Sequence, residues 1–73
     1  MIPLTKIPEG ANAEIAQLNG KEQARAVNPM GIRVGKHIEM ILNKRKGPLL
    51  LKVDETRIAI GRGMAMKILV HEK

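Results

Sequence analysis

The 73-residue chain carries a net charge of +6 and contains no Cys, Phe, Tyr or Trp. This length predicts one small domain, residues 1–73, whose core is built from Ile, Leu, Val, Met and Ala without disulfides or a thiolate metal site. No apolar run approaches the roughly 20 residues that cross a bilayer, and no secretory signal is visible, so we expect a cytoplasmic protein. The excess of Lys and Arg indicates either an acidic partner or a well-solvated surface.

The first third of the chain contains one clear helix and one ambiguous segment. Pro8-Glu9-Gly10 is a turn signal that follows a short apolar start. Residues 11–18 have helical propensity but lie between that turn and Asn19-Gly20, a strong turn dipeptide. Residues 21–27 are rich in Ala, Gln, Glu, Arg and Lys and predict a helix.

The segment 28–36 joins this helix to the strands that follow. Pro29 lacks a backbone donor and disfavours helical geometry at the preceding residue, so the helix should end there. Gly31 and Gly35 can take the positive φ that a sharp turn needs. The two glycines and Lys36 resemble a phosphate-binding loop only loosely, because the spacing is one residue short and no Ser or Thr follows the Lys. We therefore reject nucleotide binding.

Beyond residue 36, apolar and polar residues alternate in short runs that predict strands over 36–43, 49–53, 58–60 and 66–71. Alternation places Ile38, Met40 and Leu42 on one face of the first run. On the last run it places Met66, Ile68 and Val70 inward. Tight turns separate the runs, and Gly61-Arg62-Gly63 is one of them. Short strands at close spacing predict an all-β fold, a small barrel or sandwich.

The sequence offers few residues that could carry out catalysis. The chain has no Ser or Cys, and neither Thr5 nor Thr56 lies beside a His in sequence. General acid–base work by His37 with Glu39 stays conceivable, but no pocket for a substrate is indicated. We expect that the chain is not an enzyme.

A weak metal hypothesis rests on three residues, His37, Glu39 and His71. His37 and Glu39 lie two apart on one strand face, and imidazole suits Fe or Zn. This hypothesis includes a site that joins two chains in a homo-oligomer. The alternative is two exposed histidines and solvated acids, since no multi-residue ligand spacing is present. No cofactor is required by the sequence.

Binding surfaces remain as the main possibility. The basic turn Lys44-Arg45-Lys46 suits phosphate contacts, but nucleic acid is disfavoured because no aromatic ring can stack on a base. The candidate residues for protein–protein contact are Arg25, Met30, Arg33, Lys44, Arg45 and Lys46, with the outward Leu50 and Leu69.

The order of these features resembles the FeoA family over essentially the whole chain. The most specific piece is Met30-Gly31-Ile32 with Gly35, followed by an alternating strand; Gly10 also belongs to this signature. Weaker matches occur in the same order at Leu4, Ile7, Pro8, Ile15, Ile38, Gly47-Pro48, Leu51, Val53, Arg57 to Ile60, Ala65, Ile68 and Val70. Pro29 departs from the family pattern, in which the helix continues closer to the Met-Gly pair.

The resemblance implies an SH3-like barrel of about five short strands with one short helix, and it implies that residues 11–18 form a strand against their propensity. It further implies an accessory or regulatory protein of ferrous iron uptake that binds the cytoplasmic GTPase region of the FeoB-type membrane transporter. The alternatives are a transition-metal-binding or metal-sensing module and, more weakly, a nucleic-acid-binding barrel. The family brings no catalytic set.

Overall fold

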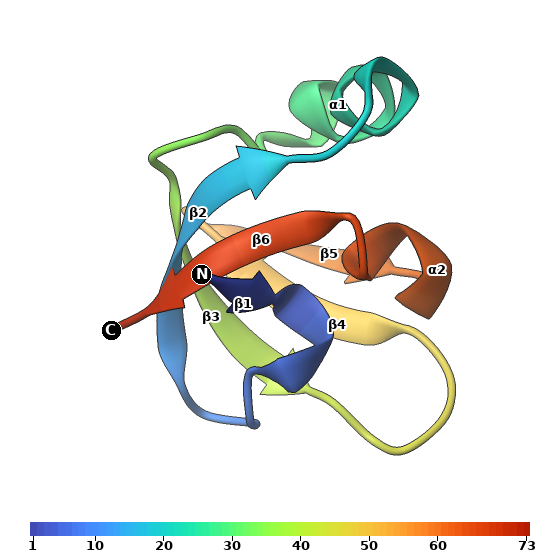
Figure 1. Ribbon diagram of the computed structural model, residues 1–73. Coiled ribbons are helices and arrows are strands. Elements are labelled where there is room, and N and C mark those ends of the chain that lie inside the picture. The colour runs from blue at the N-terminus through green and yellow to red at the C-terminus, as the bar shows by residue number, and fades with distance from the viewer.

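The computed structural model describes the backbone of residues 1–73 and every side chain except that of Gln23. Strands dominate, and α1 is the longest helix (Figure 1). The elements in chain order are β1 (Ile2–Pro3), a 3₁₀ turn (Leu4–Lys6), β2 (Asn12–Leu18), α1 (Lys21–Val27), a second 3₁₀ turn (Asn28–Met30), β3 (His37–Leu42), β4 (Leu49–Val53), β5 (Thr56–Ile60), α2 (Arg62–Ala65) and β6 (Ile68–Glu72). Among these described helices, none has the length and apolar character that crossing a membrane requires.

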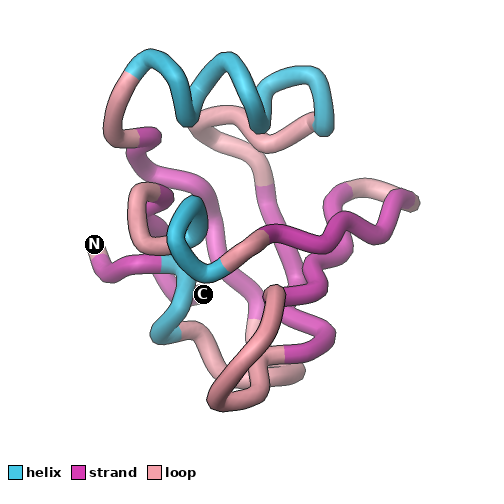
Figure 2. The backbone as a smooth tube through the Cα atoms, turned by 90° about the vertical axis from the view of Figure 1, so that its right-hand side faces the viewer, coloured by secondary structure: helices cyan, strands magenta, loops and turns pink.

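The strands form one antiparallel sheet with the order β1-β6-β2-β3-β4-β5. This sheet curls around a single interior, so that β1 and β6 lie on one side of the molecule and β4 and β5 on the other (Figures 1 and 2). The all-β barrel predicted from the sequence is confirmed, with one additional strand, the two-residue β1.

The interior is filled entirely by aliphatic side chains and Met. No polar or charged residue is buried in the described part of the chain. Each large side chain buried here contributes about 1.5–3 kcal/mol relative to exposure, which lets a core without aromatic rings suffice. The buried residues are Leu4, Ile7, Ala13, Ile15, Val27, Ile32, Ile38, Met40, Leu49, Leu51, Val53, Ile58, Ile60, Ala65, Ile68 and Val70.

The ambiguous segment 11–18 is a strand, β2, as the family resemblance implied. It lies in the middle of the sheet, paired with β3 on one side and β6 on the other. Its side chains Ala13 and Ile15 are buried at period two. Pairing on both edges outweighs a helical propensity that differs from strand propensity by only a few tenths of a kcal/mol per residue.

The joint between helix and strands also has the predicted form. Helix α1 ends at Val27, and Pro29 lies within the 3₁₀ turn that follows. Gly31 and Gly35 have φ of 89° and 93°. Between them the chain turns back and buries Ile32, and β3 begins at His37, two residues after Gly35.

Two placements predicted from alternation are wrong: that of Leu42 on the same face as Ile38 and Met40, and that of Met66 facing inward. A register shift between Met40 and Leu42 turns Leu42 outward, where it is 43% exposed. Met66 is 61% exposed because residues 62–65 form α2 rather than leading directly into a strand. The amide of Met66 donates to the Arg62 carbonyl at 3.0 Å, and β6 begins only at Ile68.

Candidate interaction surfaces

The charged and apolar residues proposed for partner contact fall into two groups at opposite ends of the barrel. Arg25 lies on α1, and Met30 and Arg33 lie just beyond it. The basic turn 44–46 joins β3 to β4 and lies at the far end from α1 (Figure 1). One flat partner face therefore does not cover both groups.

The α1 end presents an exposed apolar residue that the sequence analysis missed. Arg25 and Arg33 are exposed, Met30 is 38% exposed and Val34 is 63% exposed. Val34 follows the signature residue Ile32 by two positions, yet Ile32 is fully buried. An exposed valine at the same end as two exposed arginines gives this end the mixed character common at partner surfaces.

The glycines of the family signature determine the shape of the backbone. Gly10, Gly31 and Gly35 all have positive φ, which a residue with Cβ adopts only at a cost. The Gly35 amide donates to the Ile15 carbonyl at 2.8 Å, which anchors this turn on β2.

At the opposite end, side-chain hydrogen bonds add to backbone bonds such as that from the Gly10 amide to the Met40 carbonyl. Asn43 donates from Nδ2 to the Thr5 carbonyl at 3.0 Å and to the Ile7 carbonyl at 2.7 Å. Its Oδ1 accepts a bond from Arg62 Nη2 at 2.9 Å. Its backbone amide donates to Glu9 Oε2 at 2.8 Å. One asparagine thus ties the basic turn to the first residues of the chain and to α2.

The basic turn is only partly neutralised. Lys44 Nζ lies 3.3 Å from Glu9 Oε2, whereas Arg45 and Lys46 are exposed and form no ion pair with a described residue. The amide of Asn43, and then the ammonium of Lys44, lower the pKa of Glu9 below its ordinary value. Arg45 and Lys46 stay available to an external anion.

The two histidines of the metal hypothesis flank a carboxylate that the sequence analysis did not include, that of Glu14. Strand register places Glu14 directly opposite His37 on β3 and opposite His71 on β6. Glu14 Oε1 lies 4.0 Å from His37 Nε2 and 2.7 Å from Lys73 Nζ. The hydrogen bond and charge of Lys73 lower the pKa of Glu14, with smaller contributions from the histidines.

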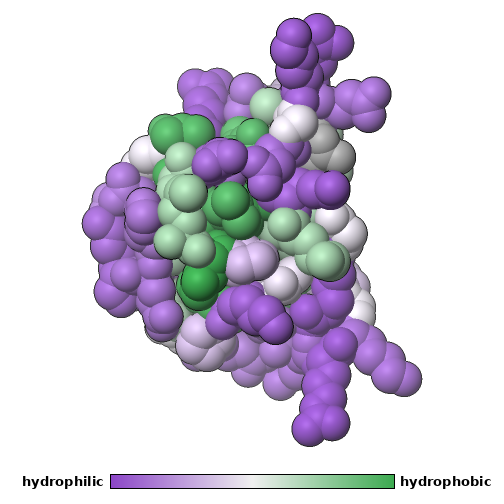
Figure 3. All heavy atoms as spheres, viewed as in Figure 1, coloured by the Kyte–Doolittle hydropathy of each residue, from purple (hydrophilic) through white to green (hydrophobic). Residues whose placement is uncertain are grey.

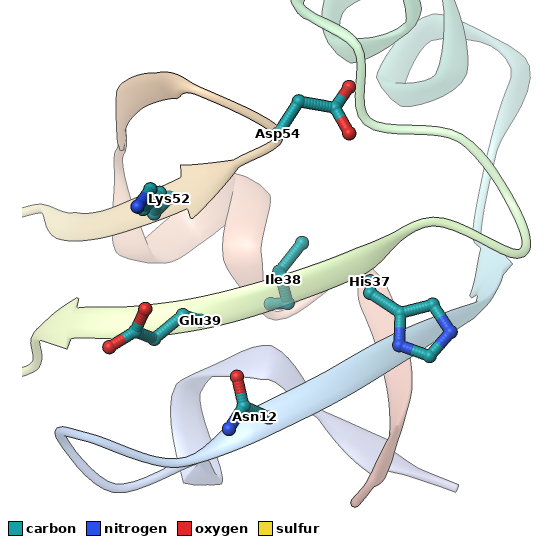
Figure 4. Close-up of a pocket in the computed structure, with 6 residues that line it drawn as sticks. All are labelled: Asn12, His37, Ile38, Glu39, Lys52 and Asp54. Carbon is teal, nitrogen blue, oxygen red and sulfur yellow. The ribbon is translucent and has the colours of Figure 1, made fainter.

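Glu39 lies outside that row, although together with His37 it lines a shallow depression of about 300 Å³ on the outer side of β2, β3 and β4 (Figure 4). It is opposite Asn12 on β2 and Lys52 on β4. Across the described residues, no three His, Asp or Glu side chains lie close enough to share one metal ion. The predicted set of His37, Glu39 and His71 is therefore not gathered here, and metal binding stays a prediction.

A second apolar area lies on the face formed by β2, β6 and β1, where Figure 3 shows apolar side chains surrounded by hydrophilic ones. Leu69, expected to point outward, is half-buried there, opposite Pro3 of β1. Met1 nearby is 63% exposed. Leu50, the other expected outward leucine, is half-buried on β4 opposite the exposed Ala59 of β5.

A strongly curved antiparallel sheet closed by short helical turns defines this protein as an SH3-like barrel. A family model described as "FeoA domain" matches residues 2–72. The chain belongs to the FeoA family, as the resemblance in the sequence indicated.

Individual relatives agree with this assignment. The chain is 34% identical over 73 residues to "Putative Fe(2+) transport protein A" of Methanocaldococcus jannaschii, covering 99% of this chain and 88% of that protein. The crystal structure of an iron uptake regulatory protein (FeoA) superposes with a TM-score of 0.91 at 26% identity, over 99% of this chain and 97% of that one. The zinc complex of Stenotrophomonas maltophilia FeoA gives a TM-score of 0.83 at 22% identity, over 96% and 89% of the two chains.

Proposed function

We propose that this protein is a cytoplasmic accessory factor of ferrous iron uptake that binds the cytoplasmic GTPase region of a FeoB-type membrane transporter. The observation that carries the proposal is the FeoA match over residues 2–72, together with the relative named for Fe(2+) transport. Its activity in this proposal is protein–protein contact, without catalysis.

The contact surface in this proposal is the α1 end of the barrel. Arg25, Arg33 and the exposed Met30 and Val34 give it cationic and apolar groups together. Binding there shifts the transporter between conformational or nucleotide states only if the two states offer different contacts to this surface. The proposal therefore expects an affinity that changes with the nucleotide bound to the transporter.

Binding of the isolated cytoplasmic domain of the transporter tests this proposal, measured without nucleotide, with GDP and with a non-hydrolysable GTP analogue. The double variant Arg25→Glu with Arg33→Glu should weaken binding by about fivefold to tenfold, as expected when exposed charge pairs become repulsive. The matched variant Arg25→Lys with Arg33→Lys keeps both charges and should bind much as the unmodified protein does. Lack of association under every nucleotide condition would overturn the proposal.

A second candidate function is binding of a transition-metal ion such as Zn(II) or Fe(II). It is favoured by the position of Glu14 between His37 and His71 and by the zinc complex of the S. maltophilia protein. The donor set does not fit a metal as it stands, because Lys73 occupies the Glu14 carboxylate. Zinc should raise the melting temperature if it binds, and His37→Ala should abolish the rise. An unchanged melting temperature at millimolar zinc would remove this candidate.

A further inference from the structure

Strand β5 leaves one of its edges without a neighbouring strand. It is last in the sheet order and pairs only with β4 among the described residues. Thr56, Arg57 and Ala59 on it are exposed. The β4–β5 hairpin lies along the side of the molecule away from β1 and the N-terminus (Figure 2). An open edge presents backbone donors and acceptors to any extended chain.

The hairpin geometry identifies which backbone groups point out of this edge. Asp54 and Glu55 form a two-residue loop, so Val53 and Thr56 close the hairpin as a hydrogen-bonded pair. Pairs then alternate along an antiparallel ladder, and the pairs containing Arg57 and Ala59 are the ones that do not bond across to β4. The N–H and C=O groups of Arg57 and Ala59 therefore face outward, and no backbone hydrogen bond from another described segment reaches them.

The side chains at this edge differ in character between the two faces of the sheet. On the outer face Arg57 stands directly opposite Lys52, and neither forms an ion pair with a described residue. The only acid opposite Lys52 is Glu39 on the other neighbouring strand. On the inner face Ile58 is 7% exposed, the highest exposure among the core residues. The edge thus presents Arg57 on its outer face, with Lys52 next to it beside Glu39 and Asp54, and an apolar inner face.

We propose that the open edge of β5 binds an extended, acidic segment of a partner protein as an additional strand. Backbone bonds to Arg57 and Ala59 hold the segment in register, as in other cases of strand addition. Its carboxylates lie beside Arg57 and Lys52, and the alternate apolar side chains lie next to Ile58. The residues of this surface differ from those proposed for transporter contact, although the β4–β5 loop meets the turn after α1 through the Lys36–Asp54 ion pair. The inference therefore goes beyond the proposed function and does not depend on it.

Other occupants match the edge less well. The phosphates of a nucleic acid would pair with the cationic side chains but would leave the outward backbone groups of β5 without hydrogen bonds. The chain also has no aromatic ring on which a base could stack. A second copy of this chain brings another net charge of +6 to a face that already places Arg57 beside Lys52. An acidic extended segment satisfies both the backbone and the charges.

The test is a titration of the ¹⁵N-labelled protein with a short synthetic peptide that alternates Glu with Val. The amide signals of Arg57 and Ala59 should shift saturably, and affinity should fall as salt is raised. A peptide alternating Lys with Val, and an acidic peptide N-methylated on its backbone, should not bind. Absence of saturable shifts at millimolar peptide, shifts centred on α1, or equal binding of the N-methylated peptide would each overturn the proposal.

Two variants separate the contributions of charge and backbone. Arg57→Glu should weaken the acidic peptide about fivefold to tenfold, whereas Lys21→Glu makes the same change of charge at an exposed position of α1 and should leave affinity unchanged. Ala59→Pro removes an outward N–H while keeping the bonds to β4, and should weaken binding without unfolding the sheet. A DNA oligonucleotide that shifts the same amides as strongly as the peptide would show a general anion site and count against strand addition.

Discussion

The two ends of the barrel are held by different kinds of interaction. At the α1 end, Gly35 donates to the Ile15 carbonyl and Ile15 donates to the Lys36 carbonyl, both at 2.8 Å and both from the backbone. At the opposite end, the Gly10 amide also donates to the Met40 carbonyl at 2.7 Å, but the side chains of Asn43 and Glu9 make further long-range bonds. The first end should therefore be sensitive to backbone geometry, and the second to the identity and ionisation of a few side chains.

Replacement of Asn43 should have the largest effect. Asn43→Ala removes the donors to the Thr5 and Ile7 carbonyls in a part-buried position and leaves Arg62 Nη2 without its acceptor. We expect the free energy of unfolding to fall by about 2 kcal/mol, because partly buried groups lose their partners. Urea unfolding measures this loss. Asn12→Ala, at an exposed strand position, is the matched control and should change stability by less than about 0.5 kcal/mol; similar losses in both variants would contradict the role of Asn43.

At the α1 end the corresponding test is Gly35→Ala. With φ at 93°, a side chain at this position should cost about 1–2 kcal/mol of unfolding free energy, although the space around it is open. Gly63→Ala is the comparison, because Gly63 lies in α2 with open space and without positive φ. Alanine there should leave stability unchanged or raise it by about 0.5–1 kcal/mol. Thermal unfolding of both variants distinguishes backbone strain from simple crowding.

The smallest expected effect concerns pH at the basic-turn end. The pKa of Glu9 is lowered in the folded protein, so its contribution to stability is complete above the ordinary Glu pKa and is lost as pH falls through the lowered value. When the pH is lowered from 7 to below about 4, the free energy of unfolding should therefore fall less in Glu9→Gln than in the unmodified protein. Melting temperatures between pH 7 and pH 3 measure the difference. Asn12→Gln, which changes no ionisable group at an exposed position, should keep the unmodified pH profile.

Local signals in the sequence were sufficient where one residue determines the backbone. Pro29 ends the helix, and Gly31 and Gly35 shape the turn after it, because φ and a missing donor are properties of the residue itself. Alternation failed at Leu42 and Met66 for a common reason. A register shift or a turn of helix depends on the neighbouring segments that the chain packs against. A period-two pattern within one segment carries no information about those neighbours.

The candidate surfaces depended still more on tertiary structure. The exposed charges Arg25, Arg33, Arg45 and Lys46 were predictable as solvated residues, but their division between two ends of the barrel was not. Glu14 was missed entirely, because only strand register brings it between His37 and His71. Register is a relation between segments distant in sequence.

The sequence by itself determined the aliphatic core, the helix with its end at Pro29, the glycine turns and, through the order of its motifs, the FeoA family. Its local propensities favoured a helix at residues 11–18, and only the pairing of β2 with both β3 and β6 made that segment a strand. Likewise, only the order of strands in the folded sheet left the edge of β5 open. The conformational propensity of one residue contributes only tenths of a kcal/mol. Strand pairing and core packing stabilise whole segments together, and they depend on the folded arrangement of the sheet.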